Sequence, residues 1–438
     1  MTQAAMGKYR WTICGLLFFA TTVNYLDRAV ISLLKPYLAA AFNWDAQQEA
    51  GNYANIEMAF KLSYAIGMLF AGRLIDKLGT KIGYALATFL WSLAAVGHAL
   101  AKGTVGFATA RVFLGITESG NFPAAIKTVA EWFPKKERAL ATGIFNSGAN
   151  IGAIIAPLSV PLIADNWGWQ WAFIITGAFG FVWLILWFLY YEVPRKQKKL
   201  GEAELNFIES DKDEKPEADE AAGPRLTWVK LLGYRQTWAF AIGKLITDPI
   251  WWFYLFWLPD FLRKQYHLTS REIMWPTAIV YIISSIGSIW GGWLPLKLIN
   301  RNWPVFKARK TSMLIYALLV LPIASAQYVG GISMWLAVMI IGLAAAAHQA
   351  WSANIFTTVS DMFPKSATAS VTGIGGLFGG LGGVMLTLFV QKRMFVYYEG
   401  IGQINKGYFI MFVICCLAYV SAWLIMHVLV PRMKKIEF

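Results

Sequence analysis

The chain has 438 residues, of which 57% are hydrophobic and only 15% are charged. Its mean hydropathy of +0.49 excludes a soluble globular protein of this length and is typical of a polytopic membrane protein. The formal net charge is +14, but the basic residues are spread over short loops rather than gathered in one domain. This distribution indicates membrane topology and attraction to anionic lipid, and it argues against nucleic-acid binding.

Apolar runs long enough to cross a bilayer as helices recur twelve times along the chain. They lie near residues 11–34, 54–75, 82–101, 104–127, 138–162, 169–191, 237–262, 273–299, 311–328, 332–358, 368–390 and 407–430. The one long polar stretch, residues 193–236, mixes Lys with Glu and Asp and predicts a charged linker without a core of its own.

Basic residues concentrate in alternate loops, on the side of the N-terminus. They include Lys8, Arg10, Arg73, Lys77, Lys81, Lys135, Lys136, Arg138, Arg195, Lys196, Lys297, Arg301 and Arg432. The positive-inside rule then predicts that both termini are cytoplasmic in a multi-pass protein of the cell (inner) membrane.

An internal repeat relates the two halves. Shifting the chain by 230 residues aligns 131–152 with 361–382, where eight of 22 positions are identical, including Phe133/Phe363 and Pro134/Pro364. We therefore predict an all-α membrane protein with two pseudo-symmetric six-helix bundles, residues 1–192 and 237–438, joined by the linker 193–236. Such a duplication is typical of alternating-access transporters with a midplane site.

Four ionisable residues interrupt apolar segments, where they are expensive and mark candidate pathways. Asp27 and Arg28 lie in the first segment, and Arg111 and Glu118 lie in the fourth. Neighbours on a helix point about 100° apart, so Asp27 can titrate while Arg28 binds an anion. Arg111 and Glu118 are two turns apart on one face, and we expect either an ion pair that opens when Glu118 is protonated or a permanent lock.

Further polar residues form helical stripes. Lys61 and Tyr64 follow Glu57 on the second segment and can hydrogen-bond a carboxylate and hydroxyls, although Glu57 and Lys61 can also be a simple pair. Lys244 and Asp248 are spaced i, i+4, so they either contact substrate or neutralise each other.

Aromatic residues crowd the seventh segment at positions 251–257. Membrane Trp and Tyr are most often interfacial, but a sugar ring also stacks on an aromatic face. Tyr254 and Trp351 are the favoured stacking candidates. The 230-residue shift matches Glu118 with His348, which is either a packed histidine or a cavity residue.

The loop Gly72-Arg-Leu-Ile-Asp76-Lys77-Leu-Gly79-Thr-Lys81 follows the second segment and resembles the loop motif of the major facilitator superfamily. In that family the aspartate, here Asp76, holds the two halves together in the outward-facing state. The counterpart at 291–297 lacks the acid.

Within that superfamily the chain resembles the anion:cation symporters, which include bacterial hexuronate and galactonate carriers and sialin. The resemblance covers nearly the whole chain and rests on residues 25–28, 110–118, 122–123, 132–138, 243–259 and 348–354. The segment 243–259 is similar to hexuronate carriers in particular.

The resemblance implies roles for single residues. It assigns proton coupling to Asp27 and Glu118, and anion binding to Arg28 and Tyr64. The spacing on the fourth segment adds Arg111 to the proton-coupling residues, as the partner of Glu118. Galactonate carriers have a glutamine in the fifth span where this chain has Ala149, next to the candidate Asn150. The other candidate substrate residues are Lys61, Lys244, Asp248, Tyr254, His348, Gln349, Trp351 and Asn354.

A uronate has a carboxyl pKa of about 3 to 4 and travels as a monoanion. An interior-negative voltage opposes its import by about 2.3 kcal/mol per 100 mV. One cotransported proton only cancels the charge of the anion, whereas two, which the carboxylates Asp27 and Glu118 permit, make the voltage favour uptake. We therefore expect a monomeric, proton-coupled importer of hexuronates such as glucuronate or galacturonate. The alternative is a carrier for another organic anion, such as an aldonate.

An enzyme is not expected, and neither is a bound metal or cofactor. The four histidines are far apart and lack ligand spacing, and no cluster of oxygen ligands indicates sodium coupling. A receptor would bind a uronate without moving it across a membrane.

Overall fold

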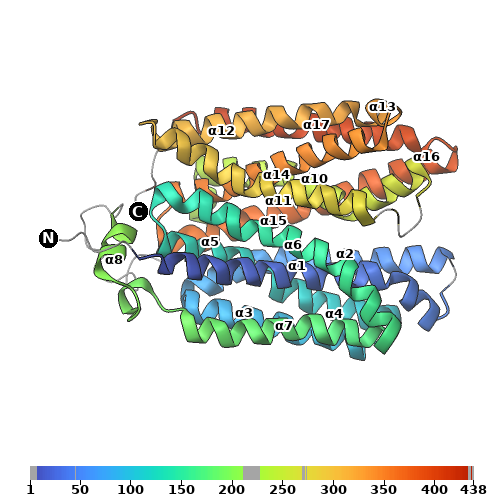
Figure 1. The fold of residues 1–438 in the computed structure, drawn as a ribbon, viewed down its shortest axis with the longest axis horizontal. Helices are drawn as coiled ribbons and strands as arrows, with labels where there is room; N and C mark the ends of the chain where they lie inside the picture. Colours follow the sequence, from blue (N-terminus) through green and yellow to red (C-terminus); the bar gives the residue numbers. More distant parts are fainter. Residues whose placement is uncertain are drawn as a thin grey trace.

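The computed structural model describes residues 7–44, 46–210, 227–268, 272, 274–432 and 436. Long helices run along one axis, with the N-terminal half forming one bundle and the C-terminal half the other (Figure 1). Both chain ends lie at the same end of the molecule, which we call the terminal end. Part of the predicted linker, 211–226, lies outside the described residues.

Seven α-helices make up the described part of the N-terminal bundle. They are α1 (Tyr9–Ala41), α2 (Ala46–Leu78), α3 (Thr80–Gly97), α4 (Gly103–Glu118), α5 (Asn121–Trp132), α6 (Lys135–Trp167) and α7 (Trp169–Tyr190). The C-terminal bundle contains α10 (Arg235–Tyr266), α11 (Met274–Ile299), α12 (Val305–Val320), α13 (Ala326–Gly330), α14 (Met334–Met362), α15 (Lys365–Leu386), a π-helical turn (Thr387–Phe395), α16 (Val396–Gly400) and α17 (Ile404–Leu429).

Ten helical spans among the described residues are long and apolar enough to cross a membrane. The other two predicted spans are α4–α5 and α10, which contain the buried ionisable residues Arg111, Glu118 and Lys244. The helix breaks between Glu118 and Asn121 because Pro123 has no N–H for the Ser119 carbonyl and its ring crowds that oxygen. The twelve predicted spans therefore all correspond to helical segments, one of them discontinuous directly after Glu118.

The sequence repeat is also a repeat of backbone geometry. Pro134 precedes α6 with φ −63° and ψ 153°, and Pro364 precedes α15 with φ −65° and ψ 157°. In both places a helix ends, an extended Phe-Pro step follows, and the next helix starts at once. The 230-residue shift thus places structurally equivalent residues in the two bundles.

The two bundles are in close contact at the terminal end. Gly72 of α2 lies against the Ala369 carbonyl of α15, and Gly143 of α6 lies against the Ser288 carbonyl of α11, so a side chain at either glycine would clash. Arg138 Nη1 donates to the Ser360 carbonyl at 2.7 Å across the same boundary. This end of the molecule is therefore closed.

The loop motif contributes directly to this closure. Asp76 accepts hydrogen bonds from the Ser370 amide at 2.9 Å and its hydroxyl at 2.7 Å, and Lys127 Nζ lies 3.0 Å from the same carboxylate. Gly79 has a φ of +78°, which favours glycine at the tight turn before α3. Lys77 is exposed, and Lys81 pairs with Glu192 at 2.7 Å.

The described part of the linker packs against the N-terminal bundle, whereas the sequence predicted only a charged linker. Helix α8 (Glu202–Glu209) places Glu204, which is 1% exposed, under the start of α1. Its carboxylate accepts the backbone N–H groups of Tyr9 and Arg10 at 3.0 and 3.1 Å and pairs with Arg10 Nη1 at 2.9 Å. The linker acid thus caps a helix N-terminus that has no capping side chain of its own.

Candidate substrate cavity between the bundles

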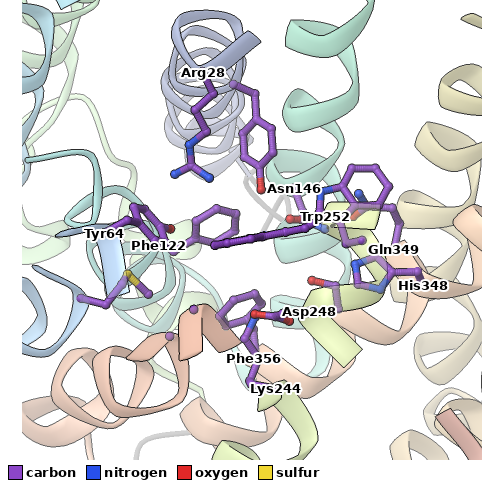
Figure 2. Close-up of a pocket in the computed structure, with 16 residues that line it drawn as sticks. Arg28, Tyr64, Phe122, Asn146, Lys244, Asp248, Trp252, His348, Gln349 and Phe356 are labelled. Carbon is purple, nitrogen blue, oxygen red and sulfur yellow. Dashed lines mark hydrogen bonds and ion pairs between the residues drawn. The ribbon is translucent and has the colours of Figure 1, made fainter. Parts of the chain in front are cut away.

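A cavity lies where the two bundles meet near the middle of the helices. Its walls are formed by Tyr25, Arg28, Tyr64, Met68, Phe122, Asn146, Lys244, Asp248, Trp251, Trp252, His348, Gln349, Ser352, Phe356, Gly376 and Gly380. Figure 2 shows Arg28 on one side of this space and Lys244 with Asp248 on the other, with Trp252 between them. Seven of the predicted site residues are therefore brought together: Arg28, Tyr64, Lys244, Asp248, His348 and Gln349 as walls, and Glu118 directly behind Arg28.

Arg28 is the central cation of the N-terminal wall. Its Nε donates to Glu118 Oε2 at 2.6 Å, and its guanidinium carbon lies 4.4 Å from the ring centre of Tyr64 and 4.7 Å from that of Tyr25. The aromatic rings hold the guanidinium through cation–π contacts. Its Nη2 has no hydrogen-bond partner among the described residues, so a donor remains for an anion in the cavity.

The expected pairing of Arg111 with Glu118 is wrong, because Glu118 pairs with Arg28 of another helix. Seven residues along a helix is an axial separation of about 10 Å, which is too long for a direct ion pair within α4. Arg111 instead donates to the Arg28 carbonyl at 3.2 Å and lies 4.0 Å from Glu57 of α2. Gly115 has no side chain, so α4 approaches α2 closely at Phe60 and Ser63. This close approach brings Arg111 of α4 near Glu57 of α2.

Asp27 faces away from the cavity, into the interior of the N-terminal bundle, and is 2% exposed. The prediction that Asp27 and Arg28 point in different directions is confirmed. Neither carboxylate oxygen of Asp27 has a full hydrogen-bond partner in the part of the chain that the structure describes, although the Thr176 hydroxyl approaches it.

Lys244 and Asp248 both line the cavity and also neutralise each other. Lys244 Nζ lies 2.7 Å from Asp248 Oδ2 and 4.0 Å from the ring centre of Phe356. The two interpretations left open by the sequence are thus compatible. The pair offers a donor and an acceptor to a hydroxylated ligand without adding net charge.

His348 and Gln349 form the remaining polar wall. The His348 ring stacks on Trp251 with centroids 5.2 Å apart, and its Nδ1 lies 2.5 Å from the Tyr419 hydroxyl. Gln349 Oε1 accepts from Asn146 Nδ2 at 2.5 Å, and Gln349 Nε2 donates to Asn150 at 3.4 Å.

Asn150 therefore supports the cavity wall from behind, and Asn146 is the amide on the wall itself. Sequence reasoning missed Asn146. A signal was present, because Asn146 and Asn150 are one helical turn apart in an otherwise small and apolar segment.

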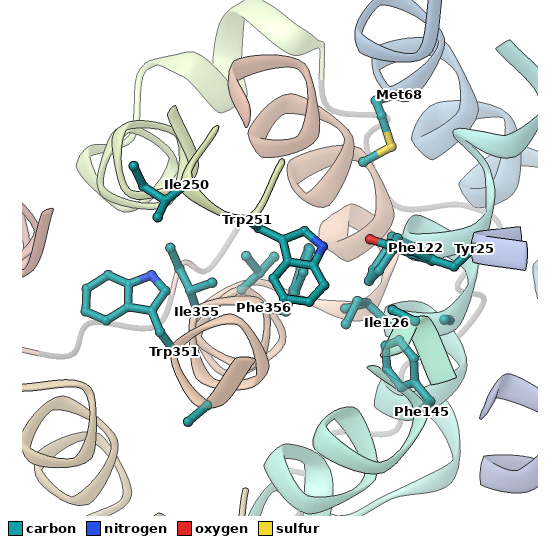
Figure 3. Packing of buried hydrophobic residues seen from close by; sticks show 14 of the residues in the cluster. Tyr25, Met68, Phe122, Ile126, Phe145, Ile250, Trp251, Trp351, Ile355 and Phe356 are labelled. Atoms are coloured by element: carbon teal, nitrogen blue, oxygen red, sulfur yellow. The ribbon is translucent and has the colours of Figure 1, made fainter. Parts of the chain in front are cut away.

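The two favoured stacking candidates are wrong, because Tyr254 and Trp351 are 0% exposed and do not line the cavity. At 100° per residue, Lys244, Asp248, Trp251 and Trp252 share an arc of about 100° on α10, and Tyr254 falls outside it. Figure 3 shows Trp251 between the two bundles and Trp351 set back in the C-terminal bundle. From the aromatic run of α10, Trp251 and Trp252 line the cavity.

Two more candidates lie outside the wall. Asn354 Nδ2 donates to the Gly291 carbonyl at 2.6 Å and so joins α14 to α11. Lys61 Nζ is 3.5 Å from the Thr387 hydroxyl and 5.8 Å from the ring centre of Trp252, one turn beyond Tyr64. Lys61 thus contacts a wall residue rather than the cavity itself.

Comparison with known proteins places this geometry in a family. The model of the Major Facilitator Superfamily matches residues 17–387. The chain belongs to the Major Facilitator Superfamily. This member is a multi-pass transporter, not an enzyme.

Several similar proteins are named as transporters of sugar acids. A hexuronate transporter of Escherichia coli K12 is 32% identical over 381 residues, which is 87% of each chain. A galacturonate transporter of Dickeya chrysanthemi is 36% identical over 287 residues, covering 66% of this chain and 81% of that one. A D-galactonate transporter of Escherichia coli O6:H1 is 27% identical over 397 residues, covering 89% and 90%.

Among solved structures, the proton:xylose symporter XylE matches with a TM-score of 0.74 over 95% of both chains at 16% identity. The Escherichia coli fucose:proton symporter FucP matches with a TM-score of 0.66 over 96% of this chain and 99% of that chain at 15% identity. At such low identities these matches bear on the fold alone. They confirm the predicted fold of two six-helix bundles.

Proposed function

We propose that this transporter is a proton-coupled symporter that imports hexuronates, such as glucuronate or galacturonate, by alternating access. The observation that carries the proposal is the buried Arg28–Glu118 pair at the cavity wall. It joins the anion-binding group and a protonatable group through one 2.6 Å contact. Two relatives at 32% and 36% identity are named for hexuronate and galacturonate.

The cavity suits an anion that carries a sugar ring. Arg28 Nη2 is available for a carboxylate on one side, and Arg is well matched to carboxylate geometry. The amides of Asn146 and Gln349 and the Lys244–Asp248 pair can bind hydroxyl groups on the other side. Trp252 supplies an apolar face for the ring carbons.

The pair also gives a reason for symport. While Glu118 is charged, it neutralises Arg28 and competes with a substrate carboxylate for the guanidinium. Protonation of Glu118 removes this competition, so proton binding raises anion affinity, and by linkage anion binding raises proton affinity. Asp27 is the second proposed proton site, and two protons per monoanion would make uptake electrogenic.

Alternating access would occur by rocking of the two bundles about this cavity. The Asp76–Ser370 contact belongs to the closed terminal end and must break when that end opens. We propose that the terminal end faces the cytoplasm of the cell membrane, because the basic loop residues gather there, and that the functional unit is a monomer.

The first test is Glu118→Gln, which keeps the size of the side chain and removes its titration. Purified protein in liposomes should lose glucuronate accumulation driven by a pH gradient and keep exchange of internal for external glucuronate. Accumulation at the unaltered rate would disprove the coupling role of Glu118. Loss of both activities would indicate that the charge is needed for folding or binding instead.

A carrier of aldonates is the second candidate, supported by the 27% identity to a D-galactonate transporter. A ligand stabilises a protein in proportion to its binding, so a thermal-shift panel discriminates the two. Glucuronate and galacturonate should raise the unfolding temperature more than galactonate and glucarate at equal concentration. The reverse order would favour the aldonate carrier.

A further inference from the structure

A row of buried hydroxyl groups runs along the inner face of α3, away from the substrate cavity. Thr80, Tyr84, Thr88 and Ser92 occur at every fourth position and are 0% to 2% exposed. At 1.5 Å per residue the row covers about 18 Å of the bundle. The outer face of the same helix is apolar and exposed, with Ile82, Leu86 and Phe89 among its residues. The polar groups of α3 thus face inward.

The half of this row nearest the terminal end is already hydrogen-bonded. Thr80 donates to Glu131 Oε1 at 2.6 Å, and Tyr191 donates to Oε2 of the same carboxylate at 2.7 Å. Tyr84 donates to Asn121 Oδ1 at 2.6 Å, and Asn121 Nδ2 lies 3.5 Å from the Thr21 hydroxyl of α1. Glu131 is half-buried, so this end of the row approaches solvent.

In the other half of the row, Thr88 Oγ1 and Ser92 Oγ have no hydrogen-bond partner among the described residues. The same holds for Trp91 Nε1 of α3 and for both side-chain polar atoms of Asn24 on α1. An unpartnered buried polar group typically costs about 1 to 3 kcal/mol, and native proteins usually satisfy such groups with water. Asn24 lies one turn from Asp27 on α1, which extends the polar face toward the acid.

Helix α7 joins the row to Asp27. Thr176 approaches the Asp27 carboxylate, and Gly180, one turn further along α7, lies directly against the Ser92 side chain. Thr176 itself donates to the Ala172 carbonyl at 2.9 Å, so its oxygen retains acceptor capacity. The charged groups that act on Asp27 are Glu118 and Arg111 of α4.

We propose that this row, with water between its unpartnered members, is an internal proton path from Asp27 to Glu131 at the terminal end. One proton leaves Asp27, each hydroxyl or water accepts one and donates one, and Glu131 accepts one and passes one to solvent, so only Asp27 is left deprotonated and every group between it and solvent returns to its starting protonation. By this path Asp27 would release its proton to solvent without the proton crossing the substrate cavity. This inference rests on the proposed proton coupling and adds its route.

Conservative variants test the path. Thr88→Val and Tyr84→Phe keep the shape and remove the hydroxyls, and the double variant should interrupt the row. Thr128→Val is the matched control, because Thr128 is equally buried and its hydroxyl is bonded to the Ala124 carbonyl of its own helix. Ser92→Ala provides an independent single change at the other end of the gap.

The readouts are glucuronate accumulation under a pH gradient and glucuronate exchange, both in liposomes. Positioned proton-transfer groups contribute factors of about 10² to 10⁴, so accumulation should slow about tenfold or more in the double variant. Exchange, which needs no net proton transfer, should change less than about twofold, and Thr128→Val should leave both unchanged. Ser92→Ala should slow accumulation in the same selective way.

Equal loss of accumulation and exchange would show a structural role for the row and overturn the proposal. Unaltered accumulation in the double variant and in Ser92→Ala would overturn it as well, while leaving the symport function intact. If the unmodified protein exchanges glucuronate but does not accumulate it under a pH gradient, the proton-coupled function fails, and the path fails with it.

Discussion

The two bundles share a sequence repeat but divide the chemistry of the site unequally. The N-terminal bundle buries Asp27, Arg28, Arg111 and Glu118, of which only Arg28 reaches the cavity wall. The C-terminal bundle provides more of the wall and contributes one internally neutral pair, Lys244–Asp248, with amide and aromatic groups.

Glu118 and His348, which the 230-residue shift aligns, show how the two halves differ. Glu118 holds a cation across helices, whereas His348 stacks on Trp251 and contacts Tyr419. A duplicated scaffold can thus place protonatable groups behind one wall and sugar-binding groups on the other. The difference predicts that variants of the N-terminal bundle alter charge coupling, and that variants of the C-terminal bundle alter affinity and stability.

The largest effect should follow from Arg28→Lys. Lysine keeps the charge but cannot bind Glu118 and a substrate carboxylate together through separate nitrogens. Loss of one charge-assisted hydrogen bond is worth about 1.5 to 3 kcal/mol, so glucuronate affinity should fall about 100-fold. Arg195→Lys, at a side chain that is 70% exposed, is the matched control and should bind normally. If Arg28→Lys binds glucuronate normally, the guanidinium of Arg28 does not bind the substrate carboxylate.

The Lys244–Asp248 pair should behave as a unit. Lys244→Met leaves a mostly buried carboxylate unpaired and should lower the free energy of unfolding by about 3 kcal/mol. Adding Asp248→Asn should recover most of that loss, as measured by unfolding in detergent for both single variants and the double variant. The double variant should bind glucuronate more weakly and keep the proton-to-substrate ratio of the parent. A changed ratio would place coupling chemistry in the C-terminal bundle as well.

A smaller effect separates the two aromatic positions on α10. Trp252→Phe shrinks the ring at the wall and should raise the KM for uptake about fivefold, as expected for one aromatic contact. Tyr254→Phe removes a buried hydroxyl that has no partner among the described residues, so KM should stay within about twofold and stability should not fall. If KM rises in Tyr254→Phe but not in Trp252→Phe, Tyr254 rather than Trp252 contacts the substrate.

The smallest effect concerns the surface pair Lys81–Glu192. The hydrogen bond from Lys81 lowers the pKa of Glu192, so the pair stabilises the fold above the unfolded-state pKa and loses this contribution as pH falls. Both side chains are about one-third exposed, and solvent screening limits the effect of Lys81→Ala to less than about 1 kcal/mol at neutral pH. The difference from the parent should vanish near pH 3.

Much of the site followed from residues that have no ordinary role in an apolar helix. Asp27, Arg28 and Glu118 stand out because ions in membrane spans are rare, and the helical angle between Asp27 and Arg28 already separated their directions. Asn146 was missed because an amide in a small-residue segment is a weaker signal than a charge. Tyr254 and Trp351 were misplaced because an aromatic run covers every side of a helix, and only the packing of α10 selects the side that faces the cavity.

The sequence by itself determined the membrane class, the twelve spans, the duplication and the family resemblance, because these depend on hydrophobic length and local motifs. Only the tertiary structure decided that Glu118 pairs with Arg28 rather than Arg111, and that Glu204 of the linker caps α1. Such pairings join residues 90 and 194 to 195 positions apart, and their partners are chosen by how helices pack. Periodicity fixes which face of a helix is polar, but packing determines which group that face meets.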